Sequence, residues 1–253
     1  RVTGKEKYKK AADHLRDQLR THPRTNEGGF WHKKIYTNQM WLDGLYMGAP
    51  FYAEYAMLFH EDSAFNDVAN QFIWMEKHAR DPKSGLLYHA WDESKEQQWA
   101  NKTTGTSPLF WSRAMGWYAD GLVDALDYFP ANHPKRKDLI GILNRLVNAV
   151  EKTQDPTTGL WYDIQLYDGP GKEKNYFEAS ASSQFVYAIA KGVRLGYLPA
   201  SKIAIAQKGY DGLVKQFIKE EKGQTNLHGT VKVSGLGGKP YRDGSFAYYM
   251  SEP

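Results

Sequence analysis

The sequence predicts an all-α fold in which helical hairpins form an arc, with inner helices around a centre and outer helices covering them. Apolar and amphipathic helical patterns alternate along the 253 residues. The motif Asp-Pro-x-x-Gly-Leu-Leu-Tyr at 81–88 also returns as Asp-Pro-x-x-Gly-Leu-Trp-Tyr at 155–162. Each copy follows an outer-type helix and precedes a loop and an inner-type helix, which is typical of a repeat architecture.

The individual elements follow from where apolar residues recur. A single apolar face predicts outer helices, at 5–21, 63–80, 135–153 and 200–221. Helices that are apolar on nearly every side are buried, and such patterns predict inner helices at 39–59, 109–129 and 178–195. A Gly-rich loop at 223–243 precedes a last inner helix, which is expected to begin at 244–249.

Residues 1–253 are expected to form one catalytic domain of this hairpin architecture. A closed double ring needs about six hairpins, more than this chain holds. We therefore expect an arc that is incomplete at both ends. Because the sequence begins with Arg1 rather than Met, we interpret the chain as a fragment of a larger toroid.

Composition and charge exclude several classes of function. The 33 basic and 29 acidic residues leave a net charge of +4, and the lysines are scattered along helix faces, so nucleic acid is not an expected partner. No apolar run reaches membrane length, so no membrane association is expected. The absence of cysteine excludes disulfides and cysteine ligands or nucleophiles, and it fits cytoplasm or periplasm equally. Because His32 and His89 are far apart and no ligand cluster accompanies them, we expect no metal and no cofactor.

Aromatic residues are abundant, with 8 Trp, 17 Tyr and 11 Phe. Part of them must form the core. Several tryptophans, however, stand beside polar residues near the starts of predicted helices. An aromatic ring packs well on the C–H face of a sugar and excludes water there, so this bias favours a carbohydrate ligand.

Asp43 is the most informative single residue, because it stands in the first turns of a helix that is apolar on nearly every side. A carboxylate there must be paired, hydrogen-bonded or protonated. Equivalent rim positions of a toroid converge on one cavity, and around Asp43 they collect further candidate binding residues. These are His32, Lys33, Trp41, His89, Trp111, Arg113 and Trp117.

Each of these residues also has a simpler interpretation. The two histidines could be ordinary loop residues, and Lys33 could be solvated. Arg113 could merely neutralise Asp43 as a buried ion pair. The tryptophans could belong to the core.

Four segments, GGFWHK, QMWLDGLYM, FWSRAMGWYA and GLGGKPYRDGSFAYYMSEP, resemble the unsaturated rhamnogalacturonyl hydrolases of glycoside hydrolase family 105. The similarity runs over essentially the whole chain. It implies an (α/α)6 toroid. It also implies removal of the 4,5-unsaturated uronic acid from the non-reducing end of lyase-generated oligosaccharides of the rhamnogalacturonan type.

The resemblance implies that Asp43 is the general acid/base of a vinyl-ether hydration. We expect the apolar helix to raise the pKa of Asp43 by desolvation, so that it can donate a proton. The resemblance further implies that the other candidate site residues bind the sugar and its carboxylate or line the pocket. The family's second Asp is expected before Arg1, and Ala247 stands where many members have Glu.

Three alternatives remain open at this stage. An ordinary glycosidase needs a second catalytic carboxylate; the loose candidates are Asp92, Glu93, Asp163 and Glu178. A sugar epimerase would depend on its histidines for proton transfer. A non-catalytic relative would keep a sugar pocket without turnover.

Overall fold

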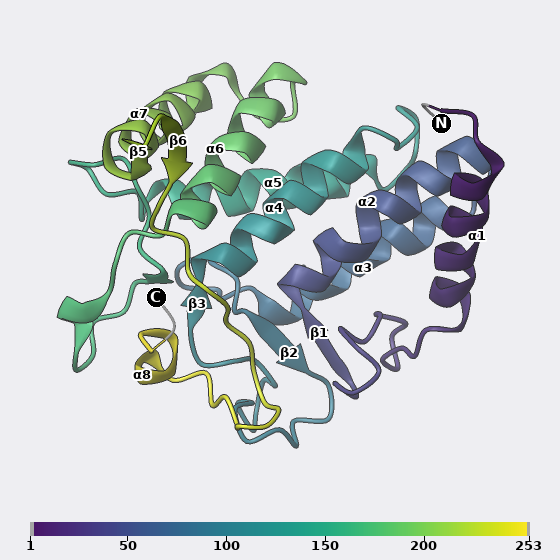
Figure 1. The fold of residues 1–253 in the computed structure, drawn as a ribbon. Coiled ribbons are helices and arrows are strands. Elements are labelled where there is room, and N and C mark those ends of the chain that lie inside the picture. Colours follow the sequence, from purple (N-terminus) through teal and green to yellow (C-terminus); the bar gives the residue numbers. More distant parts are fainter. Residues whose placement is uncertain (1–2, 252–253) are drawn as a thin grey trace.

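The computed structural model describes residues 3–251 and is mostly helical (Figure 1). The outer helices are α1 (Glu6–Thr21), α3 (Ala64–Ala79), α5 (Arg136–Glu151) and α7 (Ile203–Phe217). The inner helices are α2 (Leu42–Phe59), α4 (Ser112–Leu126), α6 (Ala179–Arg194) and the short α8 (Phe246–Tyr249). Two 3-10 helices, η1 (Lys172–Lys174) and η2 (Ala200–Lys202), lie in connections. The alternation of inner and outer helices confirms the predicted all-α arc.

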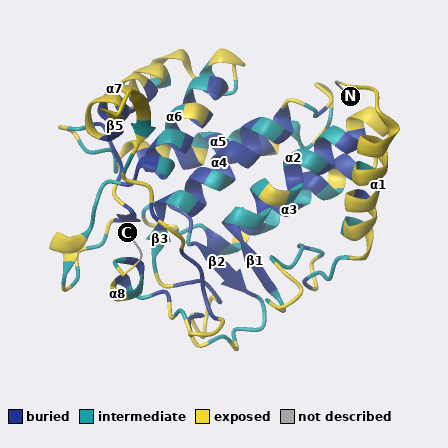
Figure 2. Cartoon of the chain, in the orientation of Figure 1, coloured by how far each residue is buried: buried dark blue, intermediate teal, exposed yellow. Residues whose placement is uncertain are grey.

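The inner helices form a row, because α4 packs against α2 on one side and α6 on the other. Figure 2 shows that α4 is mostly buried, whereas α1 and α7 at the two ends of the row carry exposed faces. Gly121 lets α2 and α4 approach, since a Cβ there would lie 3.3 Å from the backbone nitrogen of Tyr46. The apolar pattern of α4 therefore follows from contacts on both flanks.

The repeated Asp-Pro motif forms the same turn in both places. The side chain of Asp81 accepts hydrogen bonds from the backbone nitrogen and hydroxyl of Ser84, at 2.7 and 2.6 Å. Asp155 does the same with Thr158, at 2.7 and 2.9 Å. The glycine that follows each turn has a positive φ, a conformation that a side chain would strain. The motif thus ends each outer helix and turns the chain toward the next loop.

Short strands precede two of the inner helices. β1 (Gln39–Trp41) pairs antiparallel with β2 (Ala90–Asp92), and β3 (Phe110–Trp111) pairs with β4 (Ile164–Gln165). A third ladder joins β5 (Ile218–Glu221) to β6 (Gln224–Leu227). The predicted helix starts at 39 and 109 and the helix end at 221 are therefore wrong. The aromatic residues of β1 and β3 favour extended backbone, and each of these strands pairs with one that is distant in sequence, whereas β5 pairs with β6 across a tight turn.

The first two ladders create equivalent corners. Leu42 donates its backbone N–H to the carbonyl of His89, at 3.0 Å, and Ser112 donates to that of Asp163, at 2.8 Å. Each inner helix thus begins against the loop that follows the next outer helix. These corners lie at the N-terminal ends of α2 and α4, along one edge of the helix row, and position the candidate site. No helix within residues 3–251 is both long and apolar enough to cross a membrane.

Candidate active site

The centre of the site is a line of three side chains from three different parts of the chain. Asp43 lies in the first turn of α2, and its Oδ2 is 3.2 Å from Nε2 of His89. The other ring nitrogen of His89 lies 2.9 Å from the hydroxyl of Tyr249 in α8. The His89 side chain is fully buried, and that of Asp43 is 15% exposed. Asp43 is therefore reachable from outside while its partners are shielded.

The pKa of Asp43 departs from the sequence-based expectation. Burial raises it, as predicted, but the charge of His89, the hydrogen bond to that ring and the charge of His32 act in the opposite direction. Together they hold the pKa of Asp43 below its ordinary value. The prediction of a raised pKa was wrong, because it counted desolvation without the histidine that the fold brings to the carboxylate.

His32 lies close enough to Asp43 for their charges to interact, and its ring belongs to a stack of aromatic rings. Its imidazole is parallel to the indole of Trp41, with ring centroids 4.3 Å apart and planes within 3°. Tyr36 stacks at 4.8 Å from Trp41. Burial is the main cause that lowers the pKa of His32, to about 4, so the ring is neutral at neutral pH. Lys33 next to it is exposed and places its Nζ 5.8 Å over the ring of Tyr36.

Trp111, the last residue of β3, and Trp117 of α4 lie at different depths. Trp111 is buried, with its ring 4.7 Å from that of His89 and 6.0 Å from that of Tyr249. Its indole nitrogen donates to Oδ1 of Asp163, at 2.9 Å. Trp117 lies further along the chain, inside α4, and is half-buried against Tyr46, with ring centroids 4.6 Å apart. Trp111 therefore supports the histidine, whereas Trp117 is available to line an opening.

Arg113 pairs with Glu178 and not with Asp43. One terminal nitrogen lies 3.4 Å from Oε1 of Glu178 and donates to the carbonyl of Val231 at 2.5 Å, while Nε donates to the hydroxyl of Ser180 at 2.6 Å. The simple interpretation of a buried Asp43–Arg113 pair is thus wrong. Arg113 ties α4 to the start of α6 and to the loop before α8.

Three of the four candidate second carboxylates are engaged by the backbone. Asp92 accepts from the backbone nitrogens of 94 and 97, and Glu93 accepts from Asn26. Glu178 caps α6 through the backbone nitrogens of 180 and 181. Asp163, bonded to Trp111, is fully buried, and burial together with nearby Glu178 raises its pKa to about 8. None of the four lies in an open position opposite Asp43.

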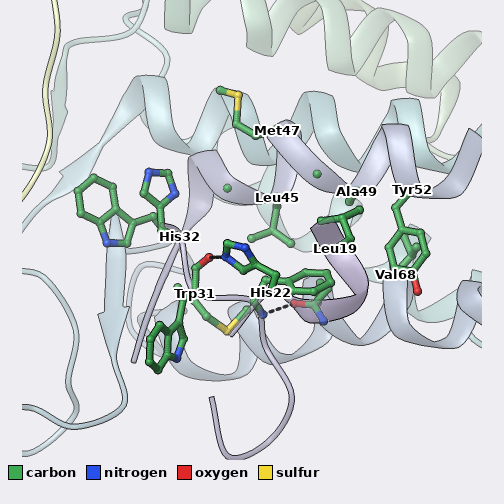
Figure 3. Close-up of a pocket in the computed structure, with 15 residues that line it drawn as sticks. Leu19, His22, Trp31, His32, Leu45, Met47, Ala49, Tyr52 and Val68 are labelled. Carbon is green, nitrogen blue, oxygen red and sulfur yellow. Dashed lines mark hydrogen bonds between the residues drawn. The ribbon is translucent and has the colours of Figure 1, made fainter. Parts of the chain in front are cut away.

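A pocket of about 180 Å³ adjoins the site between α2 and the loop before it (Figure 3). His32 and Trp41 line one end, and Tyr52 and Val68 line the other. The wall is mostly apolar, apart from a contact of 2.8 Å between His22 Nε2 and the carbonyl of Trp31. The stacked pair of His32 and Trp41 thus forms part of the wall of this mostly apolar space.

The sequence did not identify Tyr249, which lies just beyond the Tyr241–Ser245 stretch of the closing segment. Tyr249 is 160 residues from His89, so only the fold shows the contact. The same segment is attached beside His32, where Arg242 donates to the hydroxyl of Tyr36 at 2.8 Å. Ala247 is exposed on α8. Within residues 3–251, no group of three or more metal-binding side chains comes together.

Asp120, deeper on α4, supports a prediction about stability. Burial and the nearby charge of Asp124 raise its pKa to about 8. The folded state then binds a proton that the unfolded state has lost, so the free energy of unfolding falls as pH rises from about 4 to about 8, by at most about 1.4 kcal/mol per pH unit. Asp120→Asn, which cannot ionise, should remove this loss in denaturant titrations at several pH values. Exposed Asp62→Asn is the control, and parallel curves for both variants would contradict the prediction.

Comparison with known proteins identifies the family. The model of glycosyl hydrolase family 88 matches residues 1–253. A solved structure of a family 105 glycoside hydrolase from C. acetobutylicum is 55% identical, with a TM-score of 0.96, over 100% of this chain and 70% of that chain. This similarity confirms the toroid fold that the resemblance implied.

Two curated relatives support the same family assignment. Protein Atu3128 of Agrobacterium fabrum is 36% identical over 221 residues, which are 82% of this chain and 90% of that protein. The unsaturated rhamnogalacturonyl hydrolase YesR of Bacillus subtilis is 29% identical over 201 residues, 77% of this chain and 55% of YesR. This chain therefore spans about half the length of YesR. Because the family model matches from the first residue to the last, the protein belongs to glycosyl hydrolase family 88, within the family 88/105 group of helical-toroid glycosidases.

Proposed function

We propose that the protein removes a 4,5-unsaturated uronic acid from the non-reducing end of lyase-generated oligosaccharides by hydrating its double bond. The observation that carries this proposal is a single reachable carboxylate, Asp43, held by a fully buried histidine. The loose candidates for a second catalytic carboxylate are occupied elsewhere, which argues against a two-carboxylate glycosidase. Hydration of a vinyl ether needs one acid/base only.

The proposed reaction uses Asp43 twice. Its carboxyl group donates a proton to C4, so that the C4–C5 double bond is replaced by a C4–H bond and positive charge develops at C5, next to the ring oxygen. Water attacks C5 and gives its proton to the Asp43 carboxylate. The hemiketal then opens by breaking its bond from C5 to the ring oxygen. The hemiacetal left at C1 expels the glycosidically bonded alcohol.

The proton for the first step is held by the Asp43–His89 pair. Because the pKa of Asp43 lies below its ordinary value, Asp43 alone is ionised at neutral pH. The carboxyl group must therefore take up a proton before it acts on C4, and Nε2 of His89, 3.2 Å from Oδ2, is placed to deliver it. We expect kcat/KM to fall as pH rises and the pair loses this proton.

Residues around the Asp43 carboxylate would bind the charged sugar. Lys33 is exposed beside the stack of His32 and Trp41, and it is free to meet a carboxylate. Trp117 offers a half-buried ring. Arg113 is already paired with Glu178, so it would contribute to sugar binding with the nitrogen that is not so engaged. We propose rhamnogalacturonan-type oligosaccharides as the substrate, on the basis of the similarity to YesR.

The test is the ultraviolet absorbance of the conjugated C=C–carboxylate group, followed in an unsaturated rhamnogalacturonan disaccharide. Loss of absorbance together with release of the aglycone sugar would support the proposal, since epimerases and ordinary glycosidases leave the double bond intact. Unsaturated glucuronyl disaccharides serve as the second substrate. Constant absorbance with both substrates, while the disaccharides bind, would contradict the proposed turnover.

Gly44→Ala should weaken substrate binding by displacing His32. A Cβ at this position would lie 3.0 Å from Nδ1 of His32, whose backbone is fixed by a 2.7 Å hydrogen bond to Gln39. The ring must shift by a few tenths of an ångström against Trp41, and we expect KM to rise by up to about 10-fold, the equivalent of one lost contact of about 1.4 kcal/mol. Gly48→Ala, in the same helix and with nothing within 4 Å, is the matched control. Equal KM values for both variants would exclude a role for the stack.

A further inference from the structure

We propose that Tyr249 is a positioning residue for the acid/base pair: its hydroxyl keeps His89 oriented, with Nε2 facing Asp43, whether or not His89 carries the extra proton. This inference rests on the proposed function and deepens it. The proposal is based on the order of three side chains. The Tyr249 hydroxyl lies 2.9 Å from Nδ1 of His89, and Nε2 of the same ring lies 3.2 Å from Oδ2 of Asp43.

Because His89 is buried, the groups next to its two ring nitrogens determine which nitrogen carries a proton. The side chain has no exposed surface, so only protein groups face its ring nitrogens: the Tyr249 hydroxyl bonds Nδ1, and Oδ2 of Asp43 lies at ion-pair distance from Nε2 without a regular hydrogen bond to it. A neutral imidazole has one donor and one acceptor nitrogen, and an imidazolium has two donors. The nitrogen that faces the carboxylate must carry a proton in both states. The other nitrogen therefore changes from acceptor to donor when His89 takes up a proton.

Only a group that can both donate and accept fits this second nitrogen. The Tyr249 hydroxyl does so by rotating its proton: it donates to neutral His89 and accepts from the imidazolium. Burial is the main cause that raises the pKa of Tyr249 well above its ordinary value, so the hydroxyl does not ionise. Within residues 3–251, the structure gives this hydroxyl no hydrogen-bond partner other than His89.

Packing holds the two rings independently of this hydrogen bond. The indole of Trp111 lies 4.7 Å from His89 and 6.0 Å from Tyr249, and Trp41 meets His89 edge-on at 5.2 Å. α8 itself is fixed, since Ser245 caps it and a Cβ on Gly244 would meet Leu236 at 2.7 Å. Removing only the hydroxyl should therefore leave both rings in place and change the protonation of His89.

The experiment compares Tyr249→Phe with Tyr118→Phe. Tyr118 is equally buried, and its hydroxyl donates to the carbonyl of Phe72 at 2.7 Å, away from Asp43. For Tyr249→Phe we expect kcat to fall by about 10-fold with unchanged KM. The falling limb of the pH profile should also move to lower pH, because the imidazolium loses its acceptor. A profile and kcat equal to those of Tyr118→Phe would overturn the proposal.

A second measurement does not depend on turnover. Nitrogen-15 spectra of the histidine rings, with His89 assigned from a His89→Gln variant, report which ring nitrogen carries the proton. We expect the Nε2–H form in the wild type and in Tyr118→Phe, and less protonation at a given pH in Tyr249→Phe. A wild-type ring with its proton on Nδ1 alone, or no change in Tyr249→Phe, would overturn the positioning role even if the protein proved inactive on unsaturated uronides. Inactivity with the expected spectra would overturn the proposed function alone.

Discussion

Asp43→Asn is expected to reduce kcat by at least about 10³-fold, because an amide can neither give a proton to C4 nor accept one from water. The substitution preserves the shape of the side chain and can still contact Nε2 of His89. Binding of the unsaturated disaccharide should persist, since the groups proposed to hold the sugar are unchanged. The measurements are initial rates by ultraviolet absorbance and binding by calorimetry.

Two further observations make this result interpretable. Asp62→Asn changes an exposed carboxylate and should leave kcat and binding unchanged. A thermal unfolding curve of Asp43→Asn should resemble that of the wild type, which separates loss of chemistry from loss of folding. If Asp43→Asn kept more than about a tenth of the wild-type kcat, Asp43 would not be the acid/base.

Glu178→Ala is expected to lower the free energy of unfolding by about 3–5 kcal/mol, because it leaves the guanidinium of Arg113 without its anion. Glu178 is fully buried, and its carboxylate accepts from the backbone of Ala181 at 2.6 Å and from that of Val231 at 2.8 Å. It therefore caps α6, compensates a cation from α4 and holds the loop before α8. Denaturant unfolding followed by tryptophan fluorescence measures the loss.

The control for this change is Glu173→Ala, an exposed glutamate of η1, which should stay within about 0.5 kcal/mol of the wild type. The loss in the free energy of unfolding for Glu178→Gln should lie between the losses for Glu178→Ala and Glu173→Ala. The glutamine keeps an oxygen for the backbone donors but has no charge. A loss for Glu178→Ala no larger than that for Glu173→Ala would mean that Arg113 is satisfied without this carboxylate. Arg113 would then be available to bind substrate.

Local sequence patterns predicted the fold class, which the structure confirms, and a candidate site around Asp43. An apolar or amphipathic period is a property of neighbouring residues, and the turn made by Asp81 closes within four residues, so both could be predicted. Asp43 stood out because a carboxylate in an apolar helix needs a partner wherever it folds. The ends of the elements were less predictable, since β1 and β3 are extended only because distant strands pair with them.

The sequence by itself thus predicted that inner helices alternate with outer ones and that Asp43 is a carboxylate in the first turns of an apolar helix. Only the tertiary structure decided which residue partners that acid. Arg113, the natural candidate by charge, is held by Glu178, and His89 takes its place with Tyr249 behind it. The direction of the Asp43 pKa shift depends on this choice, because burial and a nearby histidine act in opposite directions. Such contacts join residues that are far apart in sequence, and no local period encodes them.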